Sequence, residues 1–221
     1  MKILHATDLH YRKGWFAWLE REAPQFDATV LSGDIYDIFL TMYRGMGVPM
    51  RHQAKWLLAY LERFPAPLFL VSGNHDFEHA LHWKNPLVRG DGTEEVFQGC
   101  RFVCAPWAEP PAGLKSGPEP LVLISHAPPA GVPVALRESG DVGDPELTPV
   151  VLGLPAGSLV LSGHAHNPPS WFAPLGAAMC LNPGTANHAS SIPNHIIIDT
   201  ERRLAGLIAD DARWAVTAIH Y

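Results

Sequence analysis

The chain has 221 residues, of which 47% are hydrophobic and 17% charged, a composition typical of one globular domain with a buried core. Its net charge of -6 argues against a surface that coats nucleic acids in general, although it leaves room for a local basic groove. No apolar run approaches the roughly 20 residues that span a bilayer, so we expect no membrane segment. We therefore treat residues 1–221 as a single domain.

The start of the chain and its cysteines indicate a compartment. Residues 1–5 lead directly into an expected strand rather than into a signal peptide. Cys100, Cys104 and Cys180 are few and odd in number, which favours reduced thiols and predicts a cytoplasmic protein. Cys100 and Cys104 could begin a zinc site, but no second pair follows, so we interpret them as small packing residues.

Apolar runs and helical periodicity alternate along the first half of the chain. Residues 39–50 combine three methionines with Gly and Pro, and are either a flexible segment beside a site or an ordinary loop. In chain order we expect a strand at 2–7, a helix at 15–23, a strand at 28–31, a helix at 54–61 and a strand at 68–71.

The second half begins with a polar, aromatic-rich stretch at 77–98, which is either a substrate-contacting loop or a solvated connection. Short turns join the last three expected strands, so we predict antiparallel hairpins that close a second sheet. After a proline-rich loop at 106–120, the expected elements are a helix beginning at Asp144 and strands at 101–104, 121–124, 159–161, 177–181, 195–199, 203–209 and 214–220.

Polar side chains follow five of the expected strands at the point where each strand ends. The densest case is 70–76, Leu-Val-Ser-Gly-Asn-His-Asp, where an apolar run gives way to a glycine and three polar residues. Open α/β sheets bind their ligands at this edge, so we expect these side chains to meet there. The candidate ligands are Asp8, His10, Asp34, Asn74, His126, His164 and His166.

These residue types predict a divalent metal centre. Carboxylate, amide and imidazole together suit Mn, Fe, Zn or a similar ion better than they suit a structural zinc held by thiolates. Seven ligands are too many for one ion, whereas two ions that share one carboxylate divide them sensibly. Such a pair lies on the order of 4 Å apart and clamps the oxygens of an in-line displacement. The remaining positive charge suits a phosphate and its transition state.

The motifs that carry these residues resemble a known family. Asp-x-His, Gly-Asp-x-x-Asp, Gly-Asn-His-Asp, a lone His and Gly-His-x-His occur in the order found in the calcineurin-like metallophosphoesterases. The match runs from Asp8 to His166, and Asn-Pro-Gly-Thr at 182–185 resembles a further family segment. The resemblance implies a four-layer α/β/β/α sandwich, in which two mixed β-sheets pack face to face and helices cover the outside.

The resemblance also implies two divalent ions per chain, with Mn as the first choice and Fe, Zn, Ni or Mg as alternatives. Asp34 would bridge the two ions. The first ion would be held by Asp8, His10, Asp34 and His166, and the second by Asp34, Asn74, His126 and His164.

Three further residues receive roles from the same resemblance. His75 would not bind metal, but would stabilise the transition state and protonate the leaving oxygen. Asp37 would hydrogen-bond His75 and keep it charged, because a nearby carboxylate raises the pKa of an imidazole. Asp76 would fix the loop that carries them.

The activity that these roles imply is hydrolysis of a small phosphomonoester or phosphodiester, such as a nucleotide, by in-line attack of a metal-bridging hydroxide. One alternative is a DNA or RNA nuclease, because Gly-Asp-Ile-Tyr-Asp and Gly-Asn-His-Asp also resemble motifs of double-strand-break-repair nucleases. Those chains are longer and carry an extra DNA-binding portion. The other is a binding scaffold, as in the phosphoesterase-like retromer subunit, against which the intact ligands and His75 argue. The sequence leaves the substrate-binding residues and the oligomeric state open.

Overall fold

The computed structural model describes residues 1–38, 47–76, 81–107, 109–111, 114, 117, 119–187, 189–209 and 214–221. Most of the segment 39–50, discussed above as a loop or flexible segment, and His79 lie outside these residues. No helix in the described part of the chain is both long and apolar enough to cross a membrane.

The helices form where the apolar periodicity predicts them. In the first helix, Trp15, Phe16 and Leu19 make one buried face, and Pro24 lies in the 3₁₀ turn that follows it. The second helix buries Leu57, Tyr60 and Leu61 in the same way. The helical bounds are α1 (Lys13–Glu22), η1 (Ala23–Gln25), α2 (Met50–Arg63), η3 (Pro133–Ala135) and α3 (Leu147–Leu152).

The first sheet has the order β15-β14-β13-β1-β2-β3-β4 among the described residues, with β1 to β4 parallel and β13 to β15 antiparallel. Its strands are β1 (Lys2–Ala6), β2 (Ala28–Ser32), β3 (Leu68–Val71), β4 (Val88–Arg89), β13 (His195–Asp199), β14 (Leu204–Ile208) and β15 (Ala218–His220).

The second sheet has the order β11-β12-β10-β7-β6-β5, and its central strands β12, β10, β7 and β6 are parallel. A separate two-stranded hairpin joins β8 (Leu136–Arg137) to β9 (Gly140–Asp141). The strands of the second sheet are β5 (Glu94–Phe97), β6 (Cys100–Cys104), β7 (Leu121–Ile124), β10 (Leu159–Leu161), β11 (Phe172–Leu175) and β12 (Ala178–Leu181).

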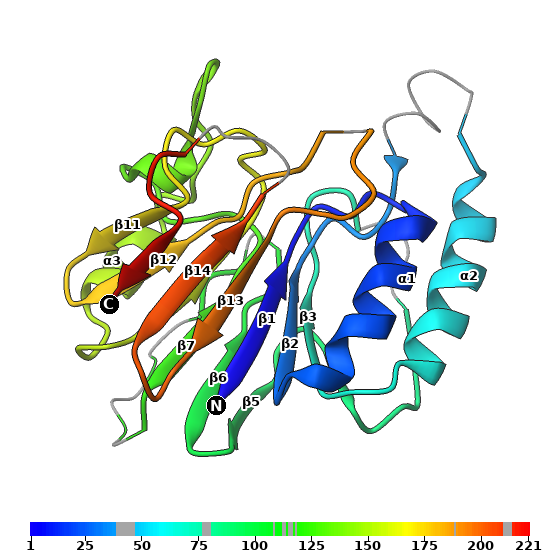
Figure 1. The fold of residues 1–221 in the computed structure, drawn as a ribbon, viewed down its shortest axis with the longest axis horizontal. Helices are drawn as coiled ribbons and strands as arrows, with labels where there is room; N and C mark the ends of the chain where they lie inside the picture. Colours follow the sequence, from blue (N-terminus) through cyan, green and yellow to red (C-terminus); the bar gives the residue numbers. More distant parts are fainter. Residues whose placement is uncertain are drawn as a thin grey trace.

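Three apolar cores separate four layers, which confirms the expected α/β/β/α sandwich of two mixed sheets. One core lies between the first sheet and helices α1 and α2, and another between the second sheet and α3 (Figure 1). The middle core joins the two sheets, and there the rings of Phe69 and Phe102 stack with centroids 4.1 Å apart. Cys100 and Cys104 are buried free thiols in this middle core, so they pack rather than bind zinc.

The prediction for the last three strands was partly wrong. They are antiparallel, as expected, but they extend the first sheet instead of closing a second one, because β13 pairs with β1 along its whole length (Figure 1). The turns between these strands fix only their order and direction. Which sheet they join depends on Ile196 and Ile198, whose side chains enter the middle core.

Several short or edge strands gave no clear signal in the sequence. In β5 the two glutamates Glu94 and Glu95 precede Val96, which is 56% exposed, so no apolar alternation marks the strand. In β11 the proline Pro174 argued against a strand, and the structure places β11 at the edge of its sheet, where a proline is tolerated. The strands β4, β8 and β9 have two residues each.

The ring stack in the middle core predicts a large loss of stability when it is removed. Phe102→Ala should lower the free energy of unfolding by about 3–5 kcal/mol, as for other buried aromatic side chains. The matched control is Val96→Ala on the neighbouring strand, which should change it by less than about 0.5 kcal/mol. Denaturant titration followed by circular dichroism measures both values. Similar losses in the two variants would contradict the assignment of Phe102 to the core.

Candidate metal centre

The candidate ligands all follow the carboxyl ends of parallel strands. Asp8 and His10 follow β1, and Asp34 follows β2. The loops after β3, β7 and β10 supply the remaining candidates, so the site takes side chains from both sheets. This is the edge at which open α/β sheets bind ligands.

Four of these residues have left-handed backbones that side chains rarely adopt. The φ angles are 54° at Asp8, 41° at His10, 54° at Asp34 and 63° at His164. Backbone hydrogen bonds between the loops hold this conformation: Asp8 N–H donates to Gly33 O at 3.1 Å, and His10 N–H donates to Asp34 O at 3.0 Å. Such strain accumulates at functional sites, where the surrounding structure supports it.

The glycines in the motifs are needed because ligand side chains lie directly against them. A Cβ at Gly73 would collide with the Asp34 carboxylate and approach its backbone nitrogen to 2.6 Å. A Cβ at Gly163 would collide with the side chains of Thr7 and Asp8. The motif glycines therefore let the loops approach closely enough for the ligand atoms to meet.

The four residues assigned to the first ion lie together. One ligand atom from each of them is within 4.8 Å of those of the other three. Nε2 of His166 is 3.2 Å from Oδ1 of Asp8 and 3.3 Å from Nε2 of His10. Asp34 completes the group, with its Oδ2 3.9 Å from Nε2 of His10.

The residues assigned to the second ion surround His126. Nε2 of His126 is 3.1 Å from Oδ1 of Asn74 and 3.3 Å from Oδ2 of Asp34. The ring of His164 meets the ring of His126 edge to face, with centroids 5.0 Å apart. The same oxygen of Asp34 thus faces histidines of both groups, as a shared carboxylate must.

Backbone carbonyls orient two of the imidazoles. Nδ1 of His10 lies 3.2 Å from the carbonyl oxygen of Tyr36, and Nδ1 of His126 lies 2.8 Å from that of Ser32. When Nδ1 donates its proton to a carbonyl, the lone pair of Nε2 is left for a metal ion. Both Nε2 atoms point to the Asp34 carboxylate.

The negative charges of the cluster favour the binding of a cation. Burial would lower the pKa of His126, but the Asp34 carboxylate outweighs it and raises the pKa to about 10. Burial would likewise raise the pKa of Asp8, yet the neighbouring histidines hold it well below its usual range. In contrast, burial together with the charge of His126 lowers the pKa of His164 to about 4. The two carboxylates therefore attract positive charge, which a proton or a metal ion can supply.

A buried carboxylate oxygen that accepts no hydrogen bond of good geometry indicates that the donor set fits a metal ion. Oδ1 of Asp8 is buried and accepts no hydrogen bond of good geometry, although Nε2 of His166 lies 3.2 Å from it. A buried carboxylate oxygen without a partner is costly unless a cation meets it. Asp8, His10, Asp34 and His166 offer oxygen and nitrogen donors of the kind that divalent transition metals prefer.

His75 lies at the centre of the site, but its expected partner does not contact it. Its ring is 4.8 Å from that of His10, and its Nε2 is 3.8 Å from Oδ2 of Asp34. The Nδ1 atom of His75 is buried without a hydrogen bond, so the bond expected from Asp37 is absent. Asp37 instead lies near Arg12, where it opposes the lowering of the guanidinium pKa by burial. The role of Asp37 as a partner of His75 therefore stays a prediction.

Asp76 braces the loops that carry the ligands. Its Oδ1 accepts the N–H groups of Ile35 at 2.9 Å and Tyr36 at 3.1 Å, and its Oδ2 accepts that of Gly73 at 2.8 Å. Burial and the charge of Asp34 raise the pKa of Asp76 to about 7, although its backbone hydrogen bonds and the charge of His126 act in the opposite direction. The brace explains the final residue of Gly-Asn-His-Asp.

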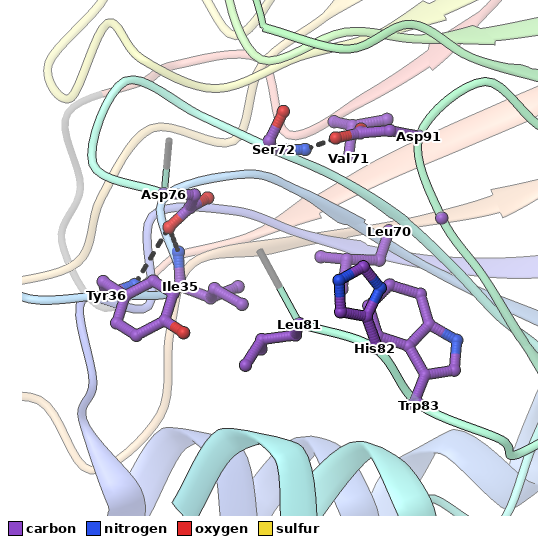
Figure 2. Close-up of a pocket in the computed structure, with 11 residues that line it drawn as sticks. Ile35, Tyr36, Leu70, Val71, Ser72, Asp76, Leu81, His82, Trp83 and Asp91 are labelled. Atoms are coloured by element: carbon purple, nitrogen blue, oxygen red, sulfur yellow. Dashed lines mark hydrogen bonds between the residues drawn. The ribbon is translucent and has the colours of Figure 1, made fainter. Parts of the chain in front are cut away.

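A cavity of about 570 Å³ adjoins this brace. Figure 2 shows the side chains of Tyr36, Leu81, His82 and Trp83 around it, with the hydrogen bonds of Asp76 at one side. None of the seven candidate ligands is among its described lining residues. His82, which belongs to the stretch 77–98 expected to be either a substrate-contacting loop or a solvated connection, thus lies at this cavity.

Sequence reasoning did not identify Trp107 as a residue of the site. Its ring lies 5.5 Å from that of His126 and 5.4 Å from that of His164. The sequence carried one signal for it: Trp107 comes just after strand 101–104, as the candidate ligands come just after their strands. Asn182, noted only by resemblance, is buried and donates to the carbonyls of Gly163 and Ala165, which holds the loop of His164.

Comparison with known protein families agrees with this geometry. A family model described as calcineurin-like phosphoesterase matches residues 1–168. Together with the doubled sheet and the Asp/His cluster, the match defines a hydrolase of phosphoester bonds with a metal-binding cluster. The chain belongs to the calcineurin-like phosphoesterase family. A comparison with curated protein sequences gives no match.

Solved structures share the fold over nearly the whole chain. The protein TT1561 of Thermus thermophilus is 14% identical, with 94% of this chain and 97% of that chain covered and a TM-score of 0.60. The phosphoesterase YfcE from E. coli is 18% identical, with 100% and 99% covered and a TM-score of 0.53. An archaeal phosphodiesterase is 17% identical, with 94% and 99% covered and a TM-score of 0.54. At these identities the likeness shows the fold.

The brace predicts a stability cost that can be measured at pH 8. Asp76→Asn keeps one acceptor oxygen but turns an amide N–H₂ toward a backbone donor, so we expect a loss of about 1–3 kcal/mol in the free energy of unfolding. The control is Asp91→Asn, because the exposed Asp91 accepts only the N–H of Ser72 and an amide oxygen can replace it. Denaturant titration compares the two, and equal losses would show that the buried brace has no special role.

Proposed function

We propose that the chain hydrolyses a small phosphomonoester or phosphodiester with two divalent ions, of which Mn²⁺ is the first choice. The observation that supports this most directly is the position of Asp34. One of its carboxylate oxygens lies 3.3 Å from Nε2 of His126 and 3.9 Å from Nε2 of His10. A single oxygen therefore faces both ligand groups, which is the arrangement that a dinuclear site requires.

The proposed ligand assignment follows the two groups. When bound, the ions would supply the charge that activates water and stabilises a phosphate transition state. The first ion would be held by Asp8, His10, Asp34 and His166, and the second by Asp34, Asn74, His126 and His164.

In this proposal His75 acts on the substrate rather than on a metal ion. Its N–H donates to Oδ1 of Asp34 at 2.9 Å, which fixes the backbone of His75 against the centre. The imidazole is partly exposed beside the ring of His10, and so it can reach a phosphate oxygen and give a proton to the leaving group.

The test compares metal-loaded protein on p-nitrophenyl phosphate and bis(p-nitrophenyl) phosphate. Wild-type protein treated with chelator and then with Mn²⁺ should bind two ions and hydrolyse at least one substrate. Asp34→Asn should weaken both ions and lower the rate by about 10²-fold or more, because the shared oxygen loses its charge. The control is Asp27→Asn, whose carboxylate accepts the N–H of Lys2 away from the site.

Each alternative activity has its own outcome in this test. One bound ion or none at saturating Mn²⁺ would refute the dinuclear site. Two bound ions without hydrolysis of any phosphate ester would favour a binding scaffold. Faster cleavage of a single-stranded oligonucleotide than of both small substrates would favour the nuclease alternative.

His75→Ala should separate chemistry from metal binding. Both ions should be retained, while hydrolysis of an alkyl phosphate falls by about 10²- to 10⁴-fold, the usual value of a positioned proton donor. The loss should be smaller for p-nitrophenyl phosphate, because nitrophenolate leaves without a proton. Asp37→Asn should cost much less than His75→Ala, and the exposed His52→Ala should have no effect. Elemental analysis and initial rates measure these effects, and loss of metal in His75→Ala would make His75 a ligand.

A further inference from the structure

Trp107 is placed unlike the other tryptophans of this protein. Of the seven in the chain, it alone belongs to none of the three cores formed by the described residues. It is half-buried, and so part of its ring surface is open to solvent. Packing in a core therefore does not explain the position of this large apolar ring. The six tryptophans in or against the cores are Trp15, Trp18, Trp56, Trp83, Trp171 and Trp214.

The ring of Trp107 forms a wall of the second ligand group. It lies edge-on to His126, with centroids 5.5 Å apart, and tilted to His164, with centroids 5.4 Å apart. The backbone N–H of Trp107 donates to the hydroxyl of Ser72 at 3.0 Å, which ties it to the loop of Gly-Asn-His-Asp. Its position relative to the metal centre is therefore fixed from both sheets.

Arg137 is an exposed residue of the hairpin formed by β8 and β9. Asn182 ties the 3₁₀ turn η3, just before this hairpin, to the loop of His164, because its amide donates to the carbonyl of Val134 at 3.1 Å as well as to that of Gly163 at 2.9 Å. Within the described part of the chain the guanidinium makes no hydrogen bond or ion pair.

We propose that Trp107 and Arg137 form the substrate-contacting wall of the site, and that the substrate is a phosphate ester with an aromatic group, such as a nucleoside. Trp107 provides a face on which the aromatic group stacks. Arg137 provides a guanidinium for an oxygen of the phosphate. The inference rests on the proposed function, because it assumes that the phosphate binds at the metal centre.

The chemistry of the two side chains favours this class of substrate. An indole face stacks on aromatic rings whatever their hydrogen-bonding groups, and stacking of a base on an aromatic side chain is worth enough to select aromatic over alkyl groups. A guanidinium binds phosphate oxygens in pairs and keeps its charge at every physiological pH. An alkyl phosphate would bind the guanidinium of Arg137 but would not stack on the indole of Trp107.

The experiment measures binding rather than turnover. Isothermal titration calorimetry on Mn²⁺-loaded protein gives Kd for phenylphosphonate and for methylphosphonate, which carry the same charged group. Wild-type protein should bind the phenyl compound more tightly. Trp107→Ala should reduce this preference by about fivefold or more, and Trp107→Phe should retain most of it. Arg137→Gln should weaken both compounds by a similar factor, roughly tenfold.

Controls separate a contact from a structural effect. Trp107→Leu keeps an apolar side chain without an aromatic face, and serves if Trp107→Ala does not fold as judged by its thermal melt. Trp83→Ala is the matched control, because Trp83 is also half-buried but lines the cavity of Figure 2. The Trp83→Ala variant should prefer phenylphosphonate over methylphosphonate by the same factor as the wild type.

Several outcomes would overturn the inference. One is that the wild type binds the two compounds equally or binds neither. Another is that the preference for phenylphosphonate over methylphosphonate stays unchanged in both Trp107→Ala and Trp107→Leu. The last is that this preference is lost in Trp83→Ala instead. Failure of the proposed function would look different. In that case the wild type would bind phenylphosphonate selectively but hydrolyse neither nitrophenyl ester.

Discussion

The carboxylate of Asp34 is the group on which the rest of the site depends. It is buried, its Oδ1 accepts the backbone N–H of His75, and its Oδ2 faces the imidazoles of both ligand groups. A charge in this position is unfavourable unless cations surround it. Protonated histidines supply part of this positive charge, and divalent ions would supply more of it. The two halves of the centre are therefore coupled through one side chain.

Backbone geometry is what brings these side chains together. The loops after β1 and β2 run side by side, joined by hydrogen bonds from Asp8, His10 and Tyr11 to the carbonyls of Gly33, Asp34 and Ile35. The left-handed conformations at the ligands are maintained by these bonds and by the Asp76 carboxylate. Much of the polar network near the centre thus supports the geometry of the loops rather than the chemistry.

The surroundings of the centre differ on its two sides. The ring of Trp107 adjoins the second ligand group, whereas the cavity beside Asp76 adjoins the brace and includes no candidate ligand among its described residues. The wall is fixed by both sheets through Ser72 and Asn182. We assign substrate contacts to the wall because the ring of Trp107 lies against two candidate ligands, His126 and His164.

The sequence by itself determined the central strands, the helices α1 and α2, and the set of ligand types. Apolar runs that end in Gly-Asp or Gly-Asn-His-Asp specify both a buried strand and the polar residues at its end, so local pattern was sufficient. The sheet joined by β13, the partner of Asp37 and the place of Trp107 were decided by tertiary structure alone. Each depends on contacts between residues far apart in the chain: Ile196 in the middle core, Arg12 beside Asp37, and His126 and His164 beside Trp107. A local pattern carries no information about such contacts, because they arise only when the two sheets pack.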